Sequence, residues 1–271
     1  MAAQTAAMRH AKSILLIQIT AVIIAACPLY GGLKLQVRNG LPIVDDIYVN
    51  GHGPYRFLVD TGSNVNLIDP RVAKEIGMTI TFQTDLESAA GKMHILGSDG
   101  NEIDLDSVKA NDQKLVFSTL EAIRRTLPEV QGVLGEWFLS HFDYVLDLQH
   151  REIEFGKQER SGTRIPYKIV NARPVISTNL GDLVLDSGTA RVTIFGVERT
   201  ATSNGMLRTL AGTQQVGLLS GEALVINKQR VWSGDAIAIG TKPEREVNGL
   251  LPLSLFKAVY FCNSEQYVIL E

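Results

Sequence analysis

The sequence predicts an all-β protein made of two similar β-barrel lobes with a cleft between them and few short helices. Most of the chain consists of short apolar segments separated by Gly and Asn, which is the pattern of short strands joined by turns. An Asp-hydroxyl-Gly peptide that closes an apolar run occurs twice, at residues 60–63 and 186–189. Because the elements after the first copy recur in the same order after the second, we expect an internal duplication.

The repeated unit is longer than the motif itself. A turn of small residues around Gly91 corresponds to one around Gly212, and the Gly-apolar-apolar peptide at 132–134 corresponds to 249–251. The duplication predicts an N-terminal lobe at 33–157 and a C-terminal lobe at 163–271, separated by a polar stretch. Each lobe is large enough to bury a core of its own.

Individual elements follow from local patterns. A helix is expected after Asp69, with Asp69 as N-cap, Pro70 at the first helical position and Gly77 just past the end. A second helical turn is expected after Gly135. The expected strands are 43–49, 56–59, 103–108, 115–117 and 153–155 in the first lobe, and 183–185, 216–219, 224–226 and 236–239 in the second.

Residues 1–27 differ from the rest and resemble an export signal. Basic residues precede a largely apolar run from Ile14 to Cys27, which is shorter than the ~18 apolar residues expected of a spanning helix. Residues 24–27 also resemble a bacterial lipobox, in which Cys27 would be lipidated; a plain cleaved signal and an uncleaved anchor are the alternatives. We therefore expect an exported protein, either periplasmic, a membrane-anchored lipoprotein or secreted, that meets a membrane only through this segment. Without Cys27 only Cys262 remains, so no intramolecular disulfide is expected.

The two aspartates are the candidate catalytic residues. A carboxylate at the end of a buried strand costs desolvation free energy unless it is hydrogen-bonded or shared. If Asp60 and Asp186 meet, they can share one proton and divide the roles of acid and base. This arrangement indicates hydrolysis of peptide bonds by an activated water, with no metal, cofactor or covalent intermediate.

The chain resembles the retropepsin-like and pepsin-like aspartic proteases, specifically the bacterial kind that carries both lobes in one chain. The resemblance covers roughly residues 41–271. It rests on the two motifs, on the stretch 50–60 and on the apolar-apolar-Gly element at 133–135. Residues 250–252 depart from the family pattern, because Pro252 replaces the final Gly.

The resemblance implies roles for the residues beside each aspartate. In the family the hydroxyl after each Asp bonds across the lobe interface, which assigns Thr61 and Ser187 to that role. The glycines that follow, Gly62 and Gly188, complete the supporting loops. Ser63 and Thr189 would hydrogen-bond the outer carboxylate oxygens.

A β-hairpin flap is the other feature that the resemblance implies. The candidate segments contain Ala90 and Gly91 in the first lobe and Gly212 in the second. The Tyr of pepsin-like flaps is missing from both segments, which favours the retropepsin-like manner of holding the substrate.

The leading hypothesis is an aspartic endopeptidase that binds an extended peptide or protein by strand addition. The main alternative is an exported, non-catalytic peptide-binding protein with the same fold; a purely structural interaction protein is a third. Nucleic acid is not an expected partner, because the net charge is −3 and there is no basic patch. The sequence also has no Gly-x-Ser-x-Gly elbow and no metal-ligand spacing of its five His residues.

Overall fold

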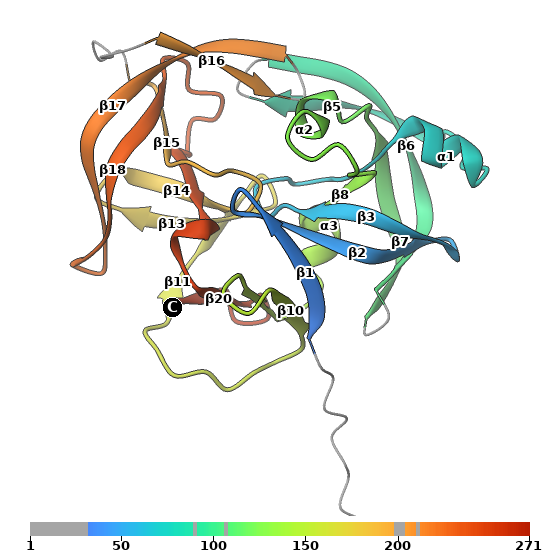
Figure 1. The fold of residues 1–271 in the computed structure, drawn as a ribbon, viewed down its shortest axis with the longest axis horizontal. Helices are drawn as coiled ribbons and strands as arrows, with labels where there is room; N and C mark the ends of the chain where they lie inside the picture. The colour runs from blue at the N-terminus through green and yellow to red at the C-terminus, as the bar shows by residue number, and fades with distance from the viewer. Residues whose placement is uncertain (1–31, 89–90, 106–107, 198–203, 210–211) are drawn as a thin grey trace, which may run out of the picture.

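The computed structural model describes residues 32–88, 91–105, 108–197, 204–209 and 212–271. These residues form a sheet of 13 strands and a sheet of 8 strands, with three short helices, α1 (Pro70–Glu75), α2 (Glu121–Arg124) and α3 (Glu136–Leu139) (Figure 1). The strands are β1 (Leu33–Arg38), β2 (Leu41–Val49), β3 (His52–Val59), β4 (Asn66–Ile68), β5 (Phe82–Ser88), β6 (Gly91–Asp104), β7 (Lys109–Phe117), β8 (Gly132–Leu134), β9 (Tyr144–Asp147), β10 (Glu152–Phe155), β11 (Ile165–Pro166), β12 (Lys168–Val170), β13 (Arg173–Thr178), β14 (Gly181–Asp186), β15 (Thr193–Phe195), β16 (Asn204–Thr209), β17 (Gly212–Ile226), β18 (Gln229–Ile239), β19 (Gly249–Pro252), β20 (Ala258–Cys262) and β21 (Tyr267–Leu270). The predicted all-β, two-lobed fold class is confirmed.

Both lobes use the same set of strand pairings around the motif. In the first lobe β3 runs parallel to β8, β4 runs parallel to β7, and β4 and β8 are antiparallel. In the second lobe β14 and β19, β15 and β18, and β15 and β19 pair in the same three ways. Since β3 and β14 lead into the two motifs, each Asp emerges from the centre of a buried sheet.

A six-stranded antiparallel part of the larger sheet joins the lobes, in the order β1-β10-β9-β20-β21-β11. Its central pair, β9 and β20, brings together one strand from each lobe, and we call this part the bridging sheet. Tyr144 of β9 stacks on Phe261 of β20 with ring centroids 4.8 Å apart, and both rings are fully buried. The lobes therefore share apolar core as well as a backbone ladder.

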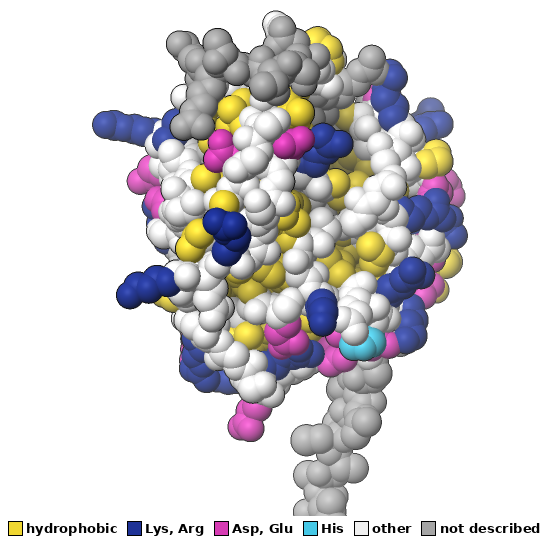
Figure 2. Space-filling view, turned by 60° about the vertical axis from the view of Figure 1, so that its left-hand side comes forward, with side chains coloured by type: hydrophobic (Ala, Val, Ile, Leu, Met, Phe, Trp, Pro, Cys, Tyr) yellow, Lys and Arg dark blue, Asp and Glu magenta, His cyan; other side chains and the backbone are white. Residues whose placement is uncertain are grey.

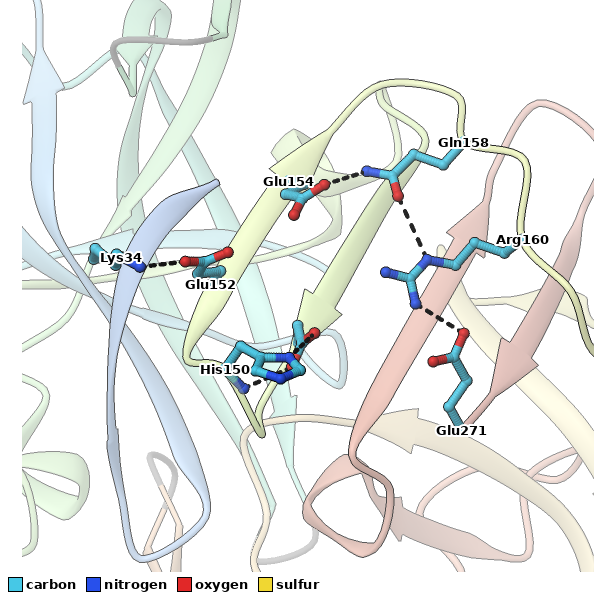
Figure 3. A network of polar contacts seen from close by, with 8 residues as sticks. Lys34, His150, Glu152, Glu154, Gln158, Arg160 and Glu271 are labelled. Carbon is cyan, nitrogen blue, oxygen red and sulfur yellow. Dashed lines mark hydrogen bonds and ion pairs between the residues drawn. The ribbon is translucent and has the colours of Figure 1, made fainter. Parts of the chain in front are cut away.

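The segment that links the lobes is hydrogen-bonded to both halves of the bridging sheet (Figure 3). Gln158 donates to Glu154 of β10 at 2.7 Å, and Arg160 reaches the carboxylate of Glu271 at 2.8 Å. The first contact is partly buried and the second is exposed, and an exposed ion pair contributes little to stability. Their effect is to fix the path of the link beside the sheet.

Helix α1 forms as the sequence predicts. The carboxylate of Asp69 accepts a hydrogen bond from the backbone N–H of Arg71 at 2.7 Å, and Pro70 occupies the first helical turn. Gly77 follows the helix with φ +72°, the left-handed conformation that ends many helices. Helix α3 likewise begins directly after Gly135, as expected.

Several strand predictions are wrong in their extent. The expected strand 103–108 is not continuous, because β6 ends at Asp104 and neither Leu105 nor Val108 belongs to a strand. The N–H of Leu105 donates to the backbone oxygen of Val108 at 2.9 Å just before β7 begins. Residues 216–219 and 224–226 belong to the single long strand β17, which continues past the irregularity that separates them.

The departure at Pro252 has a structural explanation. The N–H of Gly135 donates to the side-chain oxygen of buried Asn66 at 2.9 Å. By strand register, Pro252 takes the place of Gly135 in the second lobe, and buried Val192 takes the place of Asn66. Donor and acceptor are absent together in the second lobe, so neither is left buried and unpaired.

The predicted export signal, residues 1–27 with Cys27, lies outside the described residues and stays a prediction. Within the ranges that the structure describes, no helix has the length and apolar content needed to cross a membrane.

Gly135→Ala tests how tightly the first motif is packed from below. A Cβ at this position would overlap the backbone oxygen of Val65 and lie 2.8 Å from that of Ser63. We expect the free energy of unfolding to fall by about 1–3 kcal/mol, measured by urea denaturation. The matched control is Gly240→Ala, where the added Cβ meets nothing within 4 Å. Equal effects of the two substitutions would contradict this account.

Candidate active site

The two motif loops meet between the lobes, and each presses a glycine against the other loop's aspartate. A Cβ added at Gly62 would overlap the carboxyl group of Asp186, and one added at Gly188 would overlap that of Asp60. Only residues without a side chain allow this approach. The structure therefore brings together the two predicted catalytic residues from positions 126 residues apart, the same separation as the Thr61–Ser187 pair.

The immediate surroundings of the two carboxyl groups are matched. Asp60 accepts a hydrogen bond from the N–H of Gly62 at 2.9 Å, and Asp186 accepts one from Gly188 at 2.8 Å. The two carboxyl groups also hydrogen-bond each other. Two ionised carboxylates would repel each other, so a hydrogen bond between them requires that one of the two is protonated.

Burial sets the protonation of the pair. Loss of solvation raises the pKa of Asp60, although hydrogen bonds from the loop and from Asp186 oppose the shift. Loss of solvation and the charge of Asp60 together raise the pKa of Asp186 well above its usual range. The pair consequently holds one proton over a pH range in which two exposed aspartates would both be ionised.

The hydroxyls of Thr61 and Ser187 exchange hydrogen bonds across the lobe interface. Thr61 donates its hydroxyl to the backbone oxygen of Leu185 at 2.7 Å, and Ser187 donates to that of Val59 at 2.7 Å. Each hydroxyl in turn accepts the partner's backbone N–H, at 3.1 Å and 3.0 Å. Both residues are fully buried. These are the cross-interface contacts that the resemblance implied.

The expectation for Ser63 and Thr189 is wrong in its geometry. The hydroxyl of Ser63 donates to the backbone oxygen of Val65 at 2.8 Å, and that of Thr189 lies 3.4 Å from the oxygen of Arg191. Both side chains thus hydrogen-bond within their own turns, to the backbone oxygen two residues further along. The contribution of Ser63 to Asp60 comes from its backbone N–H, which lowers the pKa of that carboxyl.

Arg173, the first residue of β13, was not predicted as part of the site. Its charge lowers the pKa of both Asp60 and Asp186, so it lies within electrostatic range of the pair. It is mostly buried and forms an ion pair with Glu244. By register with β14, the residue that takes its place in the first lobe is Leu41, so only one lobe supplies this charge. No sequence motif marks Arg173.

The two flap candidates are hairpins. Gly91 begins β6 and pairs with Ser88 of β5, whereas Gly212 begins β17 and pairs with Thr209 of β16. Ala90 lies outside the described residues. Both hairpins lie on the side of the molecule opposite the bridging sheet (Figure 1). Strand β16 of the second lobe contacts α2 of the first lobe. The backbone thus provides a hairpin from each lobe.

The remaining features concern the distribution of side chains on the surface and the side chains that could bind a metal ion. On the face seen in Figure 2, hydrophobic side chains gather in the middle and charged side chains of both signs are spread around them. Among the described residues, no three His, Cys, Asp or Glu side chains are grouped so that they could hold a metal ion. Cys262 is buried in β20.

Comparisons with known proteins agree with this geometry. A family model described as "Aspartyl protease" matches residues 46–138, which include the first motif. The fold resembles the crystal structure of the aspartic proteinase from Irpex lacteus, with a TM-score of 0.52 and 11% identity over 88% of this chain and 96% of that one. It also resembles soybean Basic 7S globulin, with a TM-score of 0.53 and 11% identity over 88% and 94%.

The chain has the pepsin-like aspartic protease fold. No curated protein matched the sequence. At 11% identity the structural likeness establishes the fold alone.

Replacing Thr61 by Val or Ser187 by Ala removes the hydroxyl exchange between the lobes. Each change leaves buried backbone groups without a partner, so we expect a loss of about 1–3 kcal/mol in the free energy of unfolding, measured by urea denaturation. Thr189→Val is the control, because Thr189 is only partly buried and its hydroxyl makes only a long contact in its own turn. A cost at Thr189 as large as at Thr61 would argue against the interface as the cause.

Asp186→Asn tests the raised pKa. A carboxyl group whose pKa is higher in the folded state stabilises the fold fully below its usual value of 3.8, and loses that contribution as pH rises through the folded-state pKa. The wild type should therefore lose stability as pH rises from about 4 toward neutral, and the variant should lose less. Thermal unfolding at a series of pH values measures both; parallel curves would show that Asp186 titrates normally.

Proposed function

We propose that this protein is an aspartic endopeptidase that hydrolyses peptide bonds with a water activated by Asp60 and Asp186. The observation that carries the proposal is the direct contact of two carboxyl groups, one from each lobe, with raised pKa values; Asp186 is buried and Asp60 is partly buried. Burying two such groups side by side is costly and has no structural benefit that apolar residues would not provide. Groups with strongly shifted pKa values concentrate at functional sites, because a fold retains such a costly arrangement where the reaction needs it.

The chemistry follows from the shared proton. The ionised carboxyl group accepts a proton from a water that lies between the two aspartates, while the protonated one donates a hydrogen bond to the scissile carbonyl. The attacked carbonyl carbon becomes tetrahedral, and return of the proton to the leaving nitrogen completes cleavage. Loop hydrogen bonds from Gly62 and Gly188 hold each carboxyl group in place throughout.

An extended peptide is the substrate class that the fold supports best. Hairpins β5–β6 and β16–β17 present backbone groups from both lobes, as strand addition requires. The presence of one hairpin per lobe supports the retropepsin-like manner of holding a peptide.

A second candidate function, peptide binding without cleavage, also has an observation in its favour. One similar structure is named as a globulin rather than a proteinase. The family match, in addition, stops before the second motif. The two functions share the peptide ligand and differ only in whether the aspartates turn it over.

The deciding experiment measures cleavage of an unfolded protein substrate from pH 3 to 7. We expect activity in the wild type and its loss by several orders of magnitude in both Asp60→Asn and Asp186→Asn, because each removes half of the acid–base pair. Thr189→Val is the control that should keep activity. Binding of peptides by a wild type that cleaves nothing would favour the second function, and activity that survives either Asn variant would place the chemistry elsewhere.

A further inference from the structure

Glu136 is a third carboxyl group near the paired aspartates, and it is buried. It is the first residue of α3 and is 3% exposed. Its backbone N–H donates to the backbone oxygen of Ser63 at 2.9 Å, so it is tied directly to the first motif loop. Its side-chain oxygen Oε1 is buried and has no hydrogen-bond partner.

The fold does not require a carboxyl group at this position. In the second lobe, Leu253 follows Pro252 as Glu136 follows Gly135, and Leu253 is fully buried. An apolar side chain therefore fits beneath a motif loop without difficulty. Glu136 stands in an otherwise apolar stretch, residues 133–139, and this interruption is the one sequence signal that could have identified it.

The titratable groups that interact with the Glu136 carboxyl group are acidic or phenolic, and none of them carries a positive charge. Asp60 at the end of β3, Tyr144 on β9 and Tyr167 before β12 interact with it electrostatically. The phenol of Tyr144 is buried without a partner, and that of Tyr167 donates to Asn263 at 2.5 Å. On the β7 side of α3, Lys114 lies over the ring of Trp137 instead. No ion pair joins Glu136 to any residue of the described ranges.

We propose that Glu136 is a positioning residue of the aspartate pair: it is held protonated beneath Asp60, and its ionisation sets the upper pH limit of the active form. This inference rests on the proposed function. When Glu136 is neutral, the site carries the single negative charge that acid–base catalysis by two aspartates needs. When it ionises, a second buried charge without a partner appears beside Asp60 and disrupts the loop to which α3 is bonded.

The direction of the titration agrees with this role. Burial, with a further contribution from the charge of Asp60, raises the pKa of Glu136 well above its usual 4.5. The contribution of Glu136 to stability is therefore complete below 4.5 and is lost as pH rises through the folded-state pKa. Activity and folding should weaken over the same pH interval.

Two variants test the effect on activity. Glu136→Gln keeps the shape without the titration, and Glu136→Leu installs the residue of the second lobe. With each pH profile of kcat/KM normalised to its own maximum, we expect the descending limb of both variants to move to higher pH. At one pH unit above the midpoint of the wild-type descending limb, the normalised kcat/KM of each variant should be roughly tenfold higher than that of the wild type. Glu121→Gln, an exposed carboxyl on α2, is the control and should follow the wild type.

A stability measurement keeps the test independent of proteolysis. It compares the single variant Asp186→Asn with the double variant that carries Asp186→Asn and Glu136→Leu. The melting temperature of the single variant should fall with rising pH, because Glu136 is present, and that of the double variant should stay flatter. Infrared difference spectra between the same two proteins at neutral pH should show the C=O band of a protonated carboxyl group. These readouts stand even if the wild type cleaves no peptide.

The outcomes separate the two proposals. Absence of cleavage with the expected stability and infrared results would overturn the proposed function but support a protonated Glu136. An unmoved descending limb, a missing protonated-carboxyl band, or loss of activity at all pH values in folded Gln and Leu variants would each overturn the role proposed for Glu136.

Discussion

The exchange of hydrogen bonds between Thr61 and Ser187 is the contact on which the site depends. Each hydroxyl donates to a backbone oxygen of the other lobe and accepts a backbone N–H from it, so every polar group at this buried contact is paired. The exchange fixes the two motif loops relative to each other. The bridging sheet joins the same two lobes through the pairing of β9 with β20.

The aspartates at this contact are stable only because their surroundings share the electrostatic cost. A common proton, two loop N–H groups and the nearby Arg173 all offset the burial of negative charge. Glu136 works in the opposite direction, since an unpaired carboxyl near Asp60 can remain there only while it is neutral. Arg173 and Glu136 come from different lobes, and Leu stands at the equivalent position of each in the other lobe. The site is therefore electrostatically asymmetric although its backbone is nearly symmetric.

The two lobes also show which details of the fold can change together. Gly135 with Asn66 in one lobe and Pro252 with Val192 in the other are alternative solutions for the same place. The first pairs a buried N–H with a side-chain oxygen, and the second removes both groups. Either keeps the strand beneath the motif packed, and this explains why the family's glycine is not needed in the second lobe.

The sequence by itself determined the features that depend on local pattern and repetition. Alternating short apolar segments and turns indicated the all-β class, the Asp69-Pro70 pair located α1, and the repeated motif identified Asp60 and Asp186 as the residues to pair. The tertiary structure alone decided how these parts interact. The hydrogen bonds of Ser63 and Thr189, the approach of Arg173 and the burial of Glu136 depend on distances between segments far apart in the chain, and a pKa depends on that burial and those distances. Sequence spacing carries no such information, because it does not state which groups lose their water or which charges they then face.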